Sequence, residues 1–370
     1  MSRFVFNLAS VDDDEQLRVR MAADCMDGPV TVSFRREPSF FHACSVFGKR
    51  ADVIKCTETD SGTIVGLGTR ACFDAWINGE VRPHGYLSDL RGHLDYRRGT
   101  LLARGYRFLG ALHHADPVPQ YDSLVLDGND AVRRLLERPR PTLPAYHYRG
   151  RIHSPAILLA MRKPARIHTG LSVRRACSAD IPNLVAFHQR EAAIKQFAPV
   201  WREEDFGTMR MRGLRTDDIY LAISGREIVG MAAAWDQSRF RQNHVESYHG
   251  LLKLVRPFYN ALSRVTRFKP LPAPGQAIPS FYLALVAIRD NDPAIFSYLL
   301  RAIYCDRLNG PWHYMIPCFH ERDPLREVLG EYPSIEAGGH LYTVRFPLAS
   351  GEARYAEPDN RIPCVELATK

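Results

Sequence analysis

The stretch from residue 81 to residue 109 constrains the fold more than any other part of the chain. It begins with apolar and aromatic residues spaced as in a strand, and it ends with apolar residues at helical spacing from Leu101 onward. Between them lies a short turn that holds Arg97, Arg98 and Gly99. The first turn of a helix presents unpaired N–H groups and the positive end of its dipole, so this basic turn predicts an anion site. An ordinary strand-to-helix turn on a basic surface stays open as the alternative.

This stretch resembles the coenzyme A loop of the GCN5-related N-acetyltransferases, the GNAT superfamily. Leu90, Gly92 and Leu94 fall on the strand part of the family pattern, and Tyr96 and Arg97 fall on the Tyr-Arg pair that follows it. The loop departs from the pattern, because it contains one glycine where the family has two or three. The resemblance implies that this region holds acetyl-CoA or another acyl-CoA as co-substrate. The cofactor-binding residues that it implies are Leu90, Arg91, Gly92, Arg97, Arg98, Gly99, Thr100 and Leu101.

The composition is that of a globular protein with room for two domains. The chain has 370 residues, of which 45% are hydrophobic and 24% are charged. No apolar run approaches the roughly 20 residues that a membrane-spanning helix needs. The N-terminal residues lack the apolar core of a signal peptide, so we expect a cytoplasmic location. The eight cysteines are scattered without a C-x-x-C pair, and we therefore predict neither a disulfide framework nor a bound metal.

The charge pattern narrows the class of partner. The net charge of +8 is spread along the chain, and arginine outnumbers lysine, which suits the recognition of phosphate and carboxylate groups. No run of five or more like charges occurs, and no basic stripe carries regular aromatic residues. The sequence therefore does not favour nucleic acid as a partner.

The order of elements in the first half extends the resemblance to about residues 3–165. We expect a strand, two helices, three strands, the helix that follows the anion loop, a strand, a short helix and two more strands. Asn78-Gly79 is a strong signal for a hairpin turn before the third of these strands. In the GNAT fold the fourth and fifth strands splay apart around the pantetheine arm, and the matching segments here are Val81–Gly92 and Ser123–Leu126.

The pattern restarts after the linker at 163–166, which predicts an α/β fold (α+β, mixed sheet) of two tandem GNAT-like domains. The expected division is an acyl-CoA-binding domain at 1–166, a second domain with a degenerate cofactor loop at 167–349, and a polar surface tail at 350–370. The second loop, 287–293, has no glycine and carries Asp290 and Asp292, whose charge opposes phosphate. We therefore expect that this copy does not bind coenzyme A there.

Acyl transfer to an amine needs a polarised thioester carbonyl, a base and an acid for the leaving thiolate. The resemblance places Leu90 and its backbone neighbours in the first role. Asp89 lies nearest the point where the fourth strand of the family bulges, so it is the first candidate for the base, and Glu80 is another. Tyr86 is a candidate acid or substrate contact. His84 and Asp74 also lie on or beside the central strands, and a solvated or salt-bridged role stays open for every carboxylate.

The tyrosine acid that the family often has about seven residues beyond an Asn is absent, because Asn129 leads to Leu135 and Leu136. Two further segments could have a function. The segment 234–242 mixes aromatic, acidic and basic side chains and could bind a polar substrate, although a solvated loop packed by Trp235 is favoured. The amphipathic segment 251–268 could cover the cleft, touch a membrane surface or contact an acyl carrier, although core packing is favoured.

The predicted function is the transfer of an acetyl or other acyl group from coenzyme A to an amine on a small molecule or peptide. Two alternatives stay open. One is a non-catalytic coenzyme A-binding or regulatory protein, and the other is a long-chain acyltransferase that is supplied by an acyl carrier protein.

Overall fold

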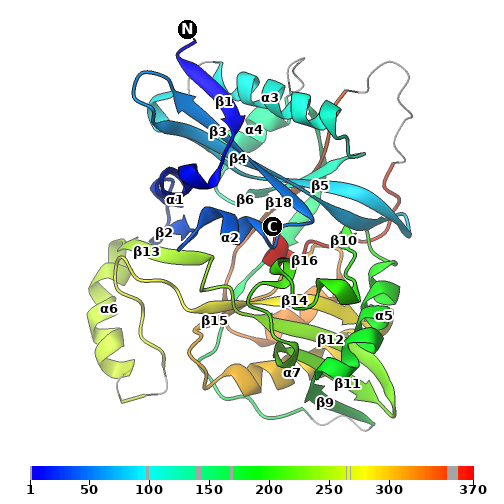
Figure 1. Ribbon diagram of the computed structural model, residues 1–370. Coiled ribbons are helices and arrows are strands. Elements are labelled where there is room, and N and C mark those ends of the chain that lie inside the picture. The colour runs from blue at the N-terminus through cyan, green and yellow to red at the C-terminus, as the bar shows by residue number, and fades with distance from the viewer. Residues whose placement is uncertain are drawn as a thin grey trace.

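The computed structural model describes residues 2–96, 100–138, 140, 143–166, 170–263, 265–266, 268–347 and 357–370. Two mixed sheets lie one above the other in Figure 1, and a two-stranded sheet joins them at one side. Strands that are parallel to their neighbours occur in both large sheets, where β5 pairs with β6 and β14 pairs with β15. The predicted α/β class with mixed sheets is confirmed.

The first sheet has the strand order β1-β3-β4-β5-β6-β18-β7-β16, with β10 attached to β4. Its strands are β1 (Phe4–Leu8), β3 (Arg50–Glu58), β4 (Ile64–Ile77), β5 (Glu80–Gly92), β6 (Tyr121–Leu126), β7 (Ala145–His153), β10 (Ala198–Pro199), β16 (Phe319–His320) and β18 (Gly338–Arg345). The predicted hairpin lies between β4 and β5, where Asn78 and Gly79 have φ of 53° and 83°. Positive φ at both central residues is what a two-residue hairpin with a type I′ turn requires.

The second sheet has the order β17-β8-β15-β14-β12-β11-β9. Its strands are β8 (Ala156–Leu158), β9 (Leu171–Arg175), β11 (Ile219–Ser224), β12 (Glu227–Trp235), β14 (Ser280–Ile288), β15 (Tyr314–Ile316) and β17 (Ser334–Ile335). The two-stranded sheet pairs β2 (Val30–Arg35) with β13 (Gln242–Tyr248). The α-helices are α1 (Asp14–Ala23), α2 (Phe40–Cys44), α3 (Leu101–Ala115), α4 (Asp130–Leu136), α5 (Ile181–Ala192), α6 (Gly250–Ser263) and α7 (Pro293–Arg307).

The two sheets exchange strands. β8 belongs to the first half of the chain but pairs with β15 and β17 in the second sheet. Conversely, β18 comes from the second half and lies between β6 and β7 in the first sheet. The division of the chain near residue 166 stays a prediction. Each sheet contains a strand from the other side of that division.

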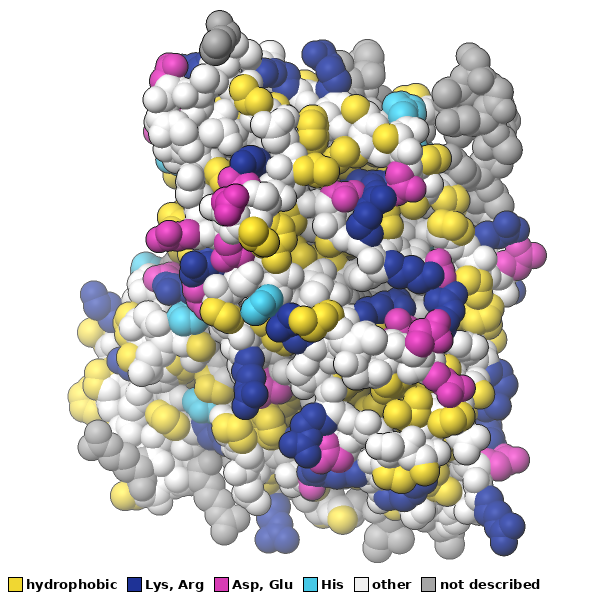
Figure 2. Space-filling view, viewed as in Figure 1, with side chains coloured by type: hydrophobic (Ala, Val, Ile, Leu, Met, Phe, Trp, Pro, Cys, Tyr) yellow, Lys and Arg dark blue, Asp and Glu magenta, His cyan; other side chains and the backbone are white. Residues whose placement is uncertain are grey.

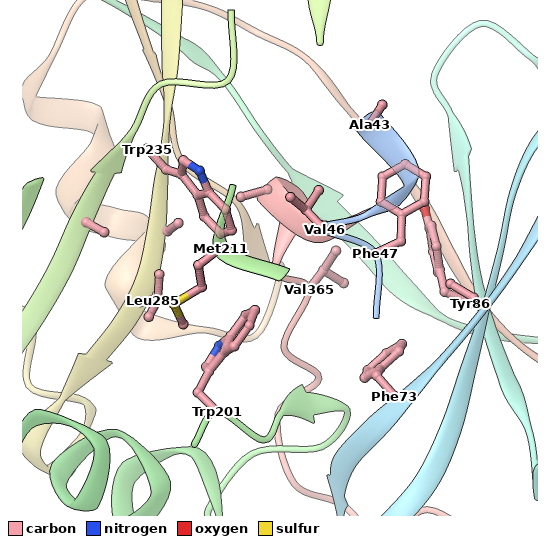
Figure 3. Close-up of a cluster of buried hydrophobic side chains, with 14 of the residues drawn as sticks. Ala43, Val46, Phe47, Phe73, Tyr86, Trp201, Met211, Trp235, Leu285 and Val365 are labelled. Carbon is pink, nitrogen blue, oxygen red and sulfur yellow. The ribbon is translucent and has the colours of Figure 1, made fainter. Parts of the chain in front are cut away.

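Charged side chains are scattered over the face that Figure 2 presents, where lysine and arginine lie among acidic and apolar groups. The apolar core, by contrast, is continuous between the two sheets. Figure 3 shows Phe47 and Tyr86 of the first half facing a group that includes Trp235 and Leu285 of the second. Burying each such side chain contributes about 2 kcal/mol, so this shared core holds the two sheets together.

Residues 365–370 contradict the prediction of a surface tail. Val365 and Ala368 are buried in the shared core, and Lys370 is buried as well. Figure 1 shows this end of the chain between the two sheets. The composition of the segment is polar, but its apolar residues fill the space that the two sheets leave between them.

Candidate active site

Strands β5 and β6 diverge in the first sheet. The register pairs Gly85 with Tyr121 and Tyr86 with Asp122, and within the described residues the parallel pairing ends there. Beyond this point the main-chain oxygen of Leu87 accepts a hydrogen bond from a side chain, Ser123 Oγ, at 3.1 Å. The predicted splay between Val81–Gly92 and Ser123–Leu126 is therefore present.

A β-bulge lies on β5 just after the strands diverge. The register with β4 shifts between Leu67 and Thr69, which face Arg91 and Ser88, so two residues of β5 oppose one of β4. The first of the two is Asp89, with a φ of +54°. Aspartate is one of the few residue types that tolerate this left-handed conformation. The prediction that Asp89 lies near a bulge is confirmed, and the next residue, Leu90, is 48% exposed.

The second sheet repeats this arrangement. In the part of the chain that the structure describes, β14 pairs with β15 through Ser280–Tyr282 and no further. Its register with β12 shifts so that Leu285 and Val286 form a bulge. Leu285 has a φ of +50°. The matching splay and the matching left-handed residue make β5 and β14 equivalent strands of two copies.

In the second copy the bulge is occupied by the C-terminal segment. The main-chain N–H of Leu285 donates to Glu366 Oε2 at 2.7 Å. Burial raises the pKa of the Glu366 carboxyl to about 7, although its main-chain hydrogen bonds oppose the shift. At the start of α7, Asp292 Oδ1 accepts from the N–H of Ala294 at 2.7 Å, so a carboxylate of the chain caps the helix where a phosphate would bind. These contacts support the expectation that this copy does not hold coenzyme A.

In the first copy the carboxylate of Asp89 lies among buried arginines. Its side chain is 7% exposed, and Arg36 Nη2 approaches Oδ1 at 3.4 Å. Thr69 Oγ1 donates to Oδ2 at 3.3 Å. Both contacts are long for hydrogen bonds, so the carboxylate is weakly held.

Arg91 is the next part of this cluster. Burial lowers the pKa of Arg91, and the charges that act on it are the carboxylates of Asp89 and Asp24 and the guanidinium groups of Arg36 and Arg20. Burial also lowers the pKa of Arg241, which the charges of Arg36 and Asp89 also affect. Within the described residues, one nitrogen of each arginine is buried without a hydrogen-bond partner: Nε of Arg20, Arg36, Arg91 and Arg241. We call these four residues the arginine cluster.

Arg241 brings the second half of the chain into the site. Its Nη1 donates to Gln237 Oε1 at 2.9 Å and to the main-chain oxygen of Ala368 at 2.8 Å, and its Nη2 donates to the main-chain oxygen of Lys370 at 2.5 Å. In the segment 234–242, Trp235 is buried as the favoured prediction expects, and Ser238 and Arg239 are exposed. Gln237 and Arg241 are buried, which a solvated loop would not predict. A cavity of about 250 Å³ borders Arg241 and Tyr282.

A second polar group lies where the strands begin to diverge. His84 Nε2 is 3.0 Å from Asp122 Oδ2, and both side chains are buried. The ammonium group of Lys370 lies over the rings of Phe73 and Tyr86, at 4.3 and 4.4 Å from their centroids. Burial raises the pKa of Tyr86 well above its usual range, so its phenol keeps its proton at neutral pH. Burial lowers the pKa of Lys370, and the negative charge of Asp122 opposes this shift.

The structure brings some of the predicted catalytic residues together and separates others. Tyr86 and Asp89 are close enough for the charge of Asp89 to affect the pKa of Tyr86. Glu80 begins β5 at the exposed hairpin, pairs with Arg82, and lies about 30 Å from Asp89 along the strand. Asp74 pairs with two cations, Lys49 and Arg202. Burial alone would raise the pKa of its carboxyl, but the hydrogen bonds and charges of these two cations keep that pKa below the usual value.

The predicted cofactor residues lie on two elements. Leu90, Arg91 and Gly92 end β5, and Leu101 begins α3, directly after Thr100. Arg97, Arg98 and Gly99 lie outside the described residues. The strand, turn and helix order that was predicted for 81–109 is confirmed on either side of this gap.

Several residues of the site were missed from the sequence. Asp122 could have been found from the sequence, because a carboxylate in an apolar strand such as Tyr121–Leu126 is costly to bury unless it has a partner. Arg36 and Lys370 could not, since their neighbours in the sequence do not reveal what the fold packs against them. Within the described residues, no group of three His, Cys, Asp or Glu side chains is placed to bind a metal ion.

No protein-family model matches the chain, and no curated protein matches its sequence. Solved structures do match. A GCN5-related N-acetyltransferase from Sphaerobacter thermophilus has a TM-score of 0.58 at 13% identity, with 100% of this chain and 99% of that one covered. The N-myristoyltransferase of Saccharomyces cerevisiae, with bound myristoyl-CoA, has a TM-score of 0.59 at 12% identity, covering 93% and 83%.

A GCN5-related glucosamine N-acetyltransferase region of a fungal multi-domain GH3 β-N-acetylglucosaminidase has a TM-score of 0.60 at 11% identity, covering 93% of this chain and 38% of that one. Identities this low speak to the fold rather than to the activity. The splayed strands and the bulge that occur twice in this chain belong to that fold. The chain therefore has the fold of the GCN5-related N-acetyltransferases.

Proposed function

We propose that the protein is an acyltransferase that moves an acyl group from coenzyme A to an amine, and that the first sheet holds the reaction. One observation carries the proposal: β5 bulges at Asp89 beside its divergence from β6, and it leads toward the N-terminus of α3. A bulge turns main-chain N–H groups out of the ladder, where one of them can donate to a thioester carbonyl. The positive end of α3 favours the phosphates of the cofactor.

The proposed chemistry uses Asp89 and Tyr86. The amine nitrogen attacks the thioester carbonyl carbon, the carbon–sulfur bond breaks, and the acyl group passes to nitrogen. Asp89 takes the proton that the amine loses, which its long contacts to Arg36 and Thr69 permit. Tyr86, which is protonated at neutral pH, gives a proton to the leaving thiolate. Glu80 has no part in this scheme because it lies at the exposed hairpin.

The arginine cluster supports an acceptor that carries an anionic group in addition to its amine. Arg36 and Arg241 are buried, and each keeps an Nε without a partner within the described residues. Buried guanidinium groups are stabilised by a carboxylate or a phosphate, which they can bind in a fork. An acceptor bound in this way would place its amine next to Asp89.

Donor binding tests the first part of the proposal. We expect isothermal titration with acetyl-CoA to give a signal that Arg97→Ala combined with Arg98→Ala weakens at least tenfold. Arg215→Ala is the matched control, because Arg215 is an exposed arginine that pairs locally with Asp217. The absence of heat with every acyl-CoA would refute the proposal.

The length of the acyl group needs its own comparison, because a similar structure holds myristoyl-CoA. Thiol release measured with acetyl, octanoyl and myristoyl donors, in the presence of a panel of amino acids and peptides, identifies the preferred donor. Donor binding without thiol release for any pair would favour the non-catalytic alternative.

A further inference from the structure

Helix α6 presents its apolar face to solvent. Within the helix no side chain is buried, and Leu251 and Phe258 are 75% and 78% exposed. Leu254 and Leu262 are also exposed, and the spacing of these four residues puts them on one side of the helix. Val265, just after the helix, is 83% exposed. The prediction that this segment packs in the core is therefore wrong.

The opposite side of α6 is tied to the protein by polar groups. Asn260 Nδ2 donates to the main-chain oxygen of Leu271 at 3.0 Å, and the N–H of Leu271 donates to Asn260 Oδ1 at 2.8 Å. Arg256 Nε donates to the main-chain oxygen of Pro272 at 3.2 Å. A helix on the surface of a globular protein ordinarily has the reverse orientation, with its apolar stripe inward. These bonds hold the apolar face outward, and Figure 1 shows α6 at the side of the molecule, away from both large sheets.

The charged residues of the sequence stretch that contains α6 have one sign. The sequence has no aspartate or glutamate from residue 247 to residue 289, while the segment that includes α6 and the residues after it contains Lys253, Arg256, Arg264, Arg267 and Lys269. Lys253 is exposed, and helical spacing puts it on the same side of α6 as Asn260, away from the four apolar residues. An exposed apolar stripe in a segment whose charged residues are all cations matches a surface that is apolar beneath and anionic above.

We propose that α6 docks on an anionic lipid membrane, lying in the plane of the interface. Within the described residues no helix is long and apolar enough to cross a bilayer. The 14 residues of α6 span about 21 Å, which suits a helix lying along the surface. A symmetric contact with a second copy of the chain is the weaker choice, because it would bring the cations of two α6 segments together without a carboxylate from this stretch to neutralise them. The proposal is independent of the acyl-transfer proposal.

Vesicle co-sedimentation tests the proposal with the full chain. We expect binding to vesicles of phosphatidylcholine with 30% phosphatidylglycerol, and at least tenfold weaker binding to phosphatidylcholine alone or in 1 M salt. Leu254→Ser combined with Phe258→Ser should reduce the binding at least tenfold. The matched control is Val11→Ser combined with Val19→Ser, which removes two exposed apolar groups elsewhere and should leave binding unchanged.

Folding of the variants is checked by their thermal unfolding, which should match that of the wild type because the substituted side chains are exposed. Phe258→Trp gives a second readout, since its emission should shift to the blue on contact with the anionic vesicles. Equal binding to neutral and anionic vesicles would overturn the proposal. A second result would also overturn it: no binding to vesicles, together with a wild-type dimer in light scattering that the Leu254→Ser and Phe258→Ser variant converts to a monomer.

Discussion

The contact between Glu366 and the second bulge predicts a specific dependence of stability on pH. Burial raises the pKa of this carboxyl from its ordinary 4.5 to about 7. The folded chain therefore binds the proton more tightly than the unfolded chain, and stability falls as the pH rises through this range. Since one pKa unit corresponds to about 1.4 kcal/mol, the free energy of unfolding should drop by about 3 kcal/mol between pH 4.5 and pH above 7 because of this group.

The substitution Glu366→Gln should remove that dependence. The variant keeps one oxygen that can accept from the N–H of Leu285. The loss of the other main-chain hydrogen bond to the carboxyl would cost about 1 kcal/mol at every pH. The informative quantity is therefore the difference in free energy of unfolding between variant and wild type, measured by urea titration from pH 4.5 to pH 8.5. We expect this difference to shift in favour of the variant by about 3 kcal/mol as the pH rises.

Glu227→Gln is the matched control, because Glu227 is an exposed carboxylate on β12 of the same sheet. Its difference from the wild type should stay constant with pH. A constant difference for Glu366→Gln as well would show that the carboxyl is ionised in the folded state, and the account of a protonated side chain filling the second bulge would be wrong.

Three further predictions concern the first sheet. Asp89→Asn, which tolerates the left-handed backbone, should lower kcat for acyl transfer by about 10²- to 10⁴-fold with donor affinity unchanged in calorimetry, and an unchanged kcat would remove Asp89 as the base. Arg36→Lys should raise the KM of an anionic acceptor about tenfold without changing the KM of the donor, because a lysine cannot form the fork; equal effects on both would argue against the acceptor role. Gly85→Ala should destabilise the fold by about 3 kcal/mol in urea unfolding, because its Cβ would lie 2.1 Å from the ring of Tyr121, which is held by Arg70; a loss below about 1 kcal/mol would show that the ring can move.

The local parts of the fold could be read from the sequence. The strand β5, the helix α3 and the hairpin at Asn78-Gly79 depend on periodicity and turn chemistry within a few residues. The bulge at Asp89 followed from the resemblance of this stretch to a known loop. For the same reason the fold class and the order of most elements were predictable, although the strand β2 between α1 and α2 was missed.

The candidate site could be predicted only in part. Tyr86 and Asp89 lie on one strand, so their proximity follows from the sequence. The arginine cluster does not, because Arg36 and Arg241 come from opposite halves of the chain and meet only after the two sheets pack. Glu80 lies on the same strand, and its spacing from Asp89 corresponds to about 30 Å, so its role as a base stays a prediction that the position at the exposed hairpin does not favour.

The sequence by itself determined most of the elements and their order, because backbone preferences and side-chain periodicity act over a few residues. Strands β2 and β13, which pair with each other, were not predicted. Only the tertiary structure decided that β8 and β18 change sheets, that Glu366 fills the second bulge and that α6 turns its apolar face outward. These outcomes depend on which surfaces of distant segments fit each other once the shared core has formed. That fit is a property of packed shapes in space, and the order of residues along the chain does not display it.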